Sequence, residues 1–156
     1  MRQLIKLKVN GELYDVVVEH QESLVDVLRN KIGLVGVKIG CKVGQCGTCT
    51  VLIDGKAFRS CLLLAMKARD KDITTIEGLA DGEDLHPLQR AFVEKGAVQC
   101  GFCTPGMILS AKSLLDEHTN PTEDEIKAAI AGNLCRCTGY TKIIEAIQAV
   151  ARNKKE

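Results

Sequence analysis

The stretch Cys41-Lys42-Val43-Gly44-Gln45-Cys46-Gly47-Thr48-Cys49 places three thiols within nine residues, and eleven residues separate it from a fourth, Cys61. The spacing C-x4-C-x2-C with a distant fourth cysteine is typical of plant-type [2Fe–2S] ligands. Four thiolates must converge on two irons, so the loop has to wrap closely around them. Glycine permits this because it accepts positive φ and lets the backbone approach. The stretch therefore predicts an electron-transfer site.

A second group of four cysteines follows in two short motifs. One is Gln99-Cys100-Gly101-Phe102-Cys103, and the other is Cys135-Arg136-Cys137. We expect both at the starts of helices, where free N–H groups and the helix dipole stabilise thiolates. Spacing alone fits a structural zinc site as well as an iron–sulfur cluster. The neighbouring plant-type motif favours iron and sulfur, because two redox centres in one chain form a relay.

Composition excludes several other classes of function. The 156 residues carry a net charge of only +1, which argues against a basic surface for nucleic acid or membrane. No secretory signal is visible, and no apolar run approaches the roughly 20 residues of a membrane helix. The sequence predicts a cytoplasmic protein. A secreted disulfide scaffold would be shorter and would space its cysteines more evenly, so we favour metal ligation.

The sequence of the first half predicts a small sheet with one helix. Residues 4–9 alternate in polarity, and Leu13 to Val18 forms the return strand after Asn10-Gly11, a strong hairpin signal. Ser23 can cap a helix that bears Leu24, Val27 and Leu28. A second hairpin joins 50–53 to 56–59 through Asp54-Gly55, and 73–76 is one more short strand. We interpret both two-residue connections as turns with no further role.

The sequence of the second half predicts helices. Helices are expected at about 87–95, at about 105–118, after the Thr122/Glu125 capping box, and around 143–150. Short connections between four helices suggest a bundle. The fold class is therefore α+β, a plant-ferredoxin-like β-grasp domain followed by a four-helix bundle. We expect the first domain at 1–77, a linker at 78–84 and the second domain at 85–156.

Three motifs together resemble a known family. G-C-x-x-G-x-C-G-x-C, Q-C-G-F-C-T-P-G and C-R-C-T-G-Y occur in the order found in the iron–sulfur subunit of the molybdenum hydroxylases. That family includes xanthine dehydrogenase, aldehyde oxidoreductase, carbon monoxide dehydrogenase, nicotinate dehydrogenase and 4-hydroxybenzoyl-CoA reductase. The resemblance covers about residues 3–150 and places all eight cysteines.

The resemblance implies two [2Fe–2S] clusters and partner subunits that carry molybdopterin-bound molybdenum and FAD. An outer cluster nearer the flavin and an inner cluster nearer the molybdenum are implied, with the ligands Cys41, Cys46, Cys49 and Cys61 for the outer and Cys100, Cys103, Cys135 and Cys137 for the inner. Gln99 and Cys137 are implied to approach the pterin. Electrons would pass from molybdenum through the inner and then the outer cluster to FAD, and this chain itself would hold no catalytic site.

Two alternatives and several minor residues remain. A free-standing two-cluster ferredoxin or a zinc-stabilised binding module would each use the same cysteines. For the complex, we expect an aromatic N-heterocycle such as nicotinate, xanthine or another purine as substrate, with carbon monoxide, aldehydes and aryl-CoA thioesters open. His86 is interpreted as a helix-entry residue, and His20 and His118 as surface residues. Arg136 could compensate the charge of a cluster or form a surface or interface salt bridge, and Phe102 could shield a cluster from water.

Overall fold

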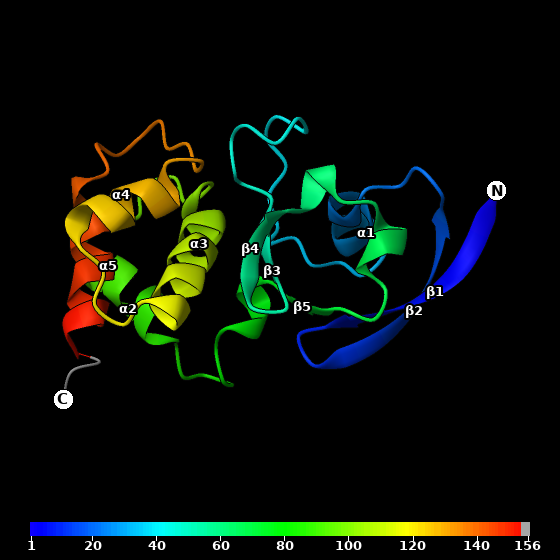
Figure 1. Cartoon of the computed structure of the whole chain (residues 1–156), viewed down its shortest axis with the longest axis horizontal. Coiled ribbons are helices and arrows are strands. Elements are labelled where there is room, and N and C mark those ends of the chain that lie inside the picture. The colour runs from blue at the N-terminus through cyan, green and yellow to red at the C-terminus, as the bar shows by residue number, and fades with distance from the viewer. Residues whose placement is uncertain (154–156) are drawn as a thin grey trace.

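The chain folds into a sheet half and a helical half that lie side by side, as the computed structural model of residues 1–153 shows (Figure 1). β1 and α5, the first and last described elements, lie at opposite ends of the molecule. The elements of the sheet half are β1 (Arg2–Val9), β2 (Glu12–Glu19), α1 (Leu24–Asn30), β3 (Thr50–Ile53), β4 (Lys56–Arg59) and β5 (Asp72–Thr74). The helical half contains α2 (Pro87–Glu94), α3 (Thr104–Glu117), α4 (Glu123–Ile130) and α5 (Thr141–Asn153).

The sheet has the strand order β2-β1-β5-β3-β4. β1 and β5 run parallel, and the other neighbouring pairs are antiparallel. The predicted alternation in β1 is confirmed, because Ile5, Leu7 and Val9 are all buried. They share one core with four fully buried residues of α1, namely Leu24, Val25, Val27 and Leu28. Ser23 caps α1 as predicted, by accepting from the Asp26 N–H.

Both two-residue turns also anchor β5, so the interpretation that they serve only as turns is wrong. Their residues have the positive φ that the sequence predicted, for example 52° at Asn10 and 83° at Gly11. The Asn10 amide in addition accepts from the Thr75 N–H at 2.8 Å and donates to the Thr75 hydroxyl at 2.9 Å. The Asp54 carboxylate accepts from the Asp72 N–H at 3.0 Å. The turn of each hairpin is thus hydrogen-bonded to one end of β5, the short strand that lies between the two hairpins.

The predicted strand 73–76 is only partly correct. β5 ends at Thr74, and Ile76–Gly78 forms a turn of 3₁₀ helix instead. The physical reason is that Ile76 and Leu79 pack against the core of the helical half rather than against the sheet. Backbone that must redirect a side chain toward another core cannot continue the alternation of a strand.

The four predicted helices of the second half are confirmed in existence and in approximate length. His86 caps α2, its Nδ1 accepting from the Leu88 N–H at 3.1 Å, so it is the helix-entry residue that the sequence indicated. Thr122 and Glu125 form the predicted capping box of α4. Fully buried residues from all four helices make a second core: Leu88, Met107, Ile126, Ile143 and Ile147 among them.

The two halves meet where α3 packs on β3 and β4. The Ala57 N–H on β4 donates to the Ser113 hydroxyl on α3 at 3.2 Å. A mixed fold of a small sheet followed by helices is therefore confirmed. None of the helices in residues 1–153 combines the length and the hydropathy needed to cross a membrane.

The anchoring role of Asn10 predicts that Asn10→Ala lowers the free energy of unfolding by roughly 2–4 kcal/mol. The change leaves the N–H of fully buried Thr75 without its acceptor and puts alanine at positive φ. Asp70→Ala is the matched control, because Asp70 is exposed and has a φ of 60°. It should cost only the backbone part, roughly 1 kcal/mol. Equal losses in urea denaturation would contradict the anchoring role.

Candidate iron–sulfur sites

The first cysteine loop, residues 41–49, is held in an irregular conformation by residues with positive φ. Gly44 and Gly47 have φ of 78° and 73°, as the sequence predicted for the glycines of this loop. Lys42 also has positive φ, and its ammonium contacts the Asp26 carboxylate of α1 at 2.8 Å. The loop is therefore fixed to the helix that covers the sheet.

Backbone N–H groups of this loop point at its own sulfurs. The N–H groups of Cys46 and Val43 donate to Cys41 Sγ at 3.3 and 3.4 Å, and the Cys41 N–H donates to Cys46 Sγ at 3.3 Å. The N–H groups of Cys46, above all, and of Val43 lower the pKa of Cys41 to about 6. The thiolate is the form that ligates metal, so the loop favours the ligating state.

The other two thiols of the first group lie deeper. Cys49 is 3% exposed, and the Cys49 and Cys61 thiols contact one another. Burial, followed by that contact, raises the pKa of Cys61 to about 11. A metal ion that binds Cys61 would therefore have to displace its proton.

The second group also pairs its thiols, Cys100 with Cys137 and Cys103 with Cys135. The Phe102 N–H lowers the pKa of Cys100, whereas contact with the Cys100 thiol raises that of Cys137. Burial raises the pKa of Cys103 to about 12. All four predicted residues are thus brought together from two segments that lie more than 30 residues apart, before α3 and before α5.

The predicted placement at helix starts holds for only one of the two motifs. Cys103 is the N-cap of α3. Cys135 and Cys137 instead lie in a loop, because a turn through Thr138 and Tyr140 separates them from the first residue of α5. Hydrogen bonds from Thr138 take the place of a helix dipole in stabilising the Cys135 thiolate. Burial opposes ionisation of Cys135, but the Thr138 hydroxyl at 3.0 Å and N–H at 3.3 Å donate to its sulfur and lower its pKa.

Tyr140 was not singled out by sequence reasoning, yet it shapes the C-x-C loop. Its φ is 66°, and its hydroxyl accepts from the Cys135 N–H at 2.8 Å while donating to the Asn133 carbonyl at 3.2 Å. The Tyr140 side chain thereby connects the end of the C-x-C loop to the backbone at its start. The only sequence signal was its place in the C-R-C-T-G-Y motif, which gives no hint of the backbone conformation.

Asn133 joins the two cysteine groups and was likewise missed. Its side chain is buried, and its amide donates to the Gly47 carbonyl at 3.1 Å and accepts from the Ser110 hydroxyl of α3 at 2.9 Å. The next residue makes a direct link, because the Leu134 N–H donates to the Cys46 carbonyl at 2.9 Å. The backbone beside Cys135 is therefore hydrogen-bonded to a predicted ligand of the other group.

Glycines allow this close approach. A Cβ on Gly106 would lie 2.5 Å from the Gly47 carbonyl, and one on Gly47 would collide with the Gly132 carbonyl. We use the name inter-group seam for Gly47, Gly106, Gly132, Asn133 and Leu134. The seam has no room for a side chain at the first two positions.

The donor sets fit a two-iron cluster. No group of three or more Cys, His, Asp or Glu side chains that could hold a metal ion is found within residues 1–153. Side-chain contacts join Cys41 with Cys46 and Cys49 with Cys61 in the first group, and Cys100 with Cys137 and Cys103 with Cys135 in the second. A [2Fe–2S] cluster takes two thiolates on each iron, whereas tetrahedral zinc takes four donors around one ion.

The remaining predicted residues lie at the surface. Gln99, Cys100 and Cys137 are exposed, and so are His20, His118 and Arg136. Phe102 is 44% exposed, and its shielding of a cluster stays a prediction. Both interpretations of Arg136 stay predictions: charge compensation of a cluster, and a surface or interface salt bridge.

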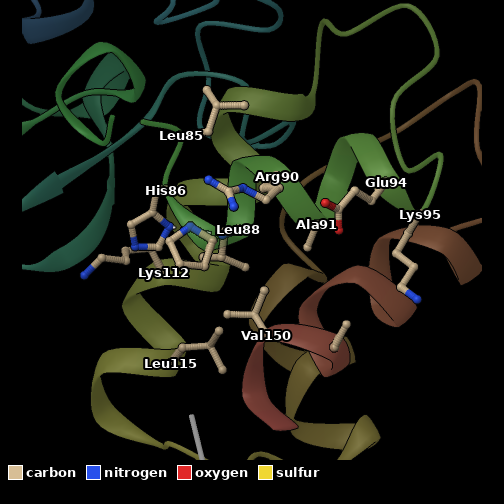
Figure 2. Close-up of a pocket in the computed structure, with 12 residues that line it drawn as sticks. Leu85, His86, Leu88, Arg90, Ala91, Glu94, Lys95, Lys112, Leu115 and Val150 are labelled. Atoms are coloured by element: carbon tan, nitrogen blue, oxygen red, sulfur yellow. Dashed lines mark hydrogen bonds between the residues drawn. The ribbon is translucent and has the colours of Figure 1, made fainter. Parts of the chain in front are cut away.

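A cavity of about 400 Å³ opens elsewhere, between α2, α3 and α5 (Figure 2). The cavity is lined by Arg90 and Glu94 of α2, Leu115 of α3 and Val150 of α5, and also by His86 and Lys112. Neither cysteine group contributes to its lining. The loops that contain residues 41–49 and 131–140 lie on the same edge of the molecule (Figure 1).

Comparison with known proteins now identifies the family. A model described as a 2Fe-2S iron-sulfur cluster binding domain matches residues 7–79, and one described as a [2Fe-2S] binding domain matches residues 75–148. The nicotinate dehydrogenase small FeS subunit of Eubacterium barkeri is 50% identical over 144 residues, which are 92% of each chain. The chain belongs to the family of small iron–sulfur subunits of the molybdenum hydroxylases. The electron-transfer function and the [2Fe–2S] cofactors predicted from the sequence are confirmed with it.

Other members of the family agree in fold. A chain of quinoline 2-oxidoreductase from Pseudomonas putida 86 superimposes with a TM-score of 0.94 at 48% identity, over 99% of this chain and 96% of that one. The aldehyde oxidoreductase of Megalodesulfovibrio gigas is 45% identical over 155 residues, which are 96% of this chain and 17% of that longer one. The sheet half is thus ferredoxin-like.

The seam predicts that Gly47→Ala destabilises the protein far more than Gly55→Ala. Both residues have positive φ, but a Cβ on Gly55 meets nothing within 4 Å, whereas one on Gly47 meets Gly132 and Asn133. Gly55→Ala should cost about 1–2 kcal/mol of unfolding free energy. Gly47→Ala should cost roughly 1–3 kcal/mol more. Similar losses for the two variants in denaturant titrations would show that the close approach is unimportant.

Proposed function

We propose that the chain relays electrons between two [2Fe–2S] clusters, one held by Cys41, Cys46, Cys49 and Cys61 and the other by Cys100, Cys103, Cys135 and Cys137. When bound, each cluster accepts and returns one electron. The chain supplies thiolates, aims N–H and hydroxyl groups at their sulfurs, and keeps both groups in fixed positions. The pairwise contacts of the thiols support this assignment.

One observation carries the relay: the Leu134 N–H donates to the Cys46 carbonyl at 2.9 Å. Cys46 belongs to the first ligand set, and Leu134 is bonded to Cys135 of the second. The two proposed sites are therefore joined by direct hydrogen bonds rather than separated by a layer of solvent. A free-standing ferredoxin with two independent sites has no need of this seam.

The exposed thiols and their apolar neighbours indicate where partner subunits would bind. Cys100 and Cys137 are exposed beside Phe102 and Leu134, which are 44% and 56% exposed. We propose that this surface faces the molybdenum subunit, with Gln99 and Cys137 toward the pterin. Around the first loop, Val43 and Leu62 are 61% and 65% exposed, and we propose this surface for the FAD subunit. Large exposed apolar side chains near a redox site are typical of an interface.

For the substrate we propose an aromatic N-heterocycle of the nicotinate, xanthine or purine kind. Two of the similar proteins are named for nicotinate and quinoline, both N-heterocycles. The aldehyde oxidoreductase among the relatives makes an aldehyde the second candidate. Carbon monoxide and aryl-CoA thioesters stay open, and the cytoplasmic location stays a prediction from the sequence.

We also propose the domain division and architecture derived from the sequence: a β-grasp domain at 1–77, a linker at 78–84 and a four-helix bundle at 85–156. Separate cores in the two halves support the division. Residues 154–156 lie outside the described part of the chain.

Single cysteine variants of the whole complex test the order of the relay. In Cys137→Ser, substrate should reduce molybdenum, but the first cluster and the flavin should stay oxidised. In Cys46→Ser, substrate should still reduce the second cluster, and only the flavin should stay oxidised. Rapid-freeze EPR and flavin absorbance report these states separately. Full flavin reduction in either variant would contradict the assignment of that ligand.

A second experiment tests the substrate class. Candidate substrates are added singly to the anaerobic native complex while its visible iron–sulfur absorbance is followed, with dithionite last. A heterocycle should bleach the bands, and an aldehyde should not. Bleaching by the aldehyde alone would overturn the heterocycle proposal. A colourless protein, or one that elutes alone near its own mass in gel filtration of native extract, would overturn the role in the complex.

A further inference from the structure

Arg59, the last residue of β4, reaches from the first cysteine group to the second. Its guanidinium donates from Nη1 to the Thr50 hydroxyl at 2.9 Å and from Nη2 to the Gly132 carbonyl at 2.8 Å. Thr50 follows the predicted ligand Cys49. The same Gly132 carbonyl abuts Gly47, the residue after Cys46. The positive charge therefore lies on the inter-group seam.

This charge has no carboxylate partner within residues 1–153. Both hydrogen-bond acceptors of Arg59 are neutral, and none of the ion pairs found in the described part of the chain includes it. Its side chain is only partly exposed. A partly buried cation without an anion costs free energy, because it loses hydration that neutral acceptors replace only in part. An anion nearby would remove that cost.

We propose that Arg59 is a counterion shared by the two clusters, which rests on the proposed function. A [2Fe–2S] cluster with four thiolates is a dianion when oxidised and a trianion when reduced. A cation beside it stabilises the reduced form more and raises its reduction potential. Because Arg59 contacts both sides of the seam, it acts on both clusters and weakens the repulsion between them when both are reduced.

The electron count fits this role. Oxidation of the substrate at the partner's molybdenum site releases two electrons, and each cluster takes up one. No bond in this chain forms or breaks. Were both clusters reduced at once, their negative charges would repel one another, and the fixed charge of Arg59 would lessen that repulsion. Arg136, by contrast, is exposed to water, which screens its charge.

Reduction potentials of both clusters, measured by EPR-monitored titration of the whole complex, test the proposal. Arg59→Gln removes the charge and should lower both midpoint potentials. Arg59→Lys keeps the charge but loses the fork of two donors, so it should lower them much less. Lys6→Gln is the control, because it removes an exposed positive charge on β1 that lies outside the seam. It should leave both potentials near those of the unmodified complex.

Three results would overturn the shared counterion. Arg59→Gln could leave both potentials unchanged, it could move only one of them, or Arg59→Lys could lower them as much as Arg59→Gln does. Failure of the proposed function looks different, because the unmodified complex would then lack two iron–sulfur EPR signals altogether. Presence of both signals with unmoved potentials counts against Arg59 alone.

Discussion

The structure depends on one buried polar contact between its halves. The Asn133 side chain is only 1% exposed and connects the first cysteine loop with α3, while the adjoining backbone connects to Cys46 and to Tyr140. Amide groups buried in this way must keep all their partners, because an unsatisfied one costs the full desolvation penalty. The contact therefore permits one relative placement of the two cysteine groups. A redox relay needs such a fixed placement.

The surrounding fold brings together the backbone segments that this contact joins. Each half has its own hydrophobic core. Glycine at 47 and 106 lets two backbones come together, and α3 packs over β3 and β4 to bring its first turn to the cysteine loop. The sulfurs then receive donors from their own loops, such as Val43 and Thr138, rather than from across the seam. The hydrogen bonds to the sulfurs are thus separate from the contacts that join the two cysteine groups.

The sequence predicted the features that depend on neighbouring residues. Cysteine spacing indicated the loop and the cofactor, Asn10-Gly11 indicated a turn, and Thr122 with Glu125 indicated a helix start. It did not reveal contacts across the halves, such as Arg59 with Gly132 or Asn133 with Gly47, whose partners lie 73 and 86 residues apart. No local pattern encodes such pairs, because they exist only once α3 has docked on the sheet. For the same reason, β5 is shorter than its sequence predicts, because Ile76 packs against the core of the helical half instead of continuing the strand.

The most direct test of two clusters at a fixed separation is the EPR spectrum of the fully reduced native complex. Two distinct signals, each integrating to one spin per chain, should appear. Each should also be split by magnetic interaction with the other, because the seam holds both paramagnetic centres in one geometry. A single signal, or two signals with no mutual splitting at any degree of reduction, would contradict the account of a rigid two-cluster relay.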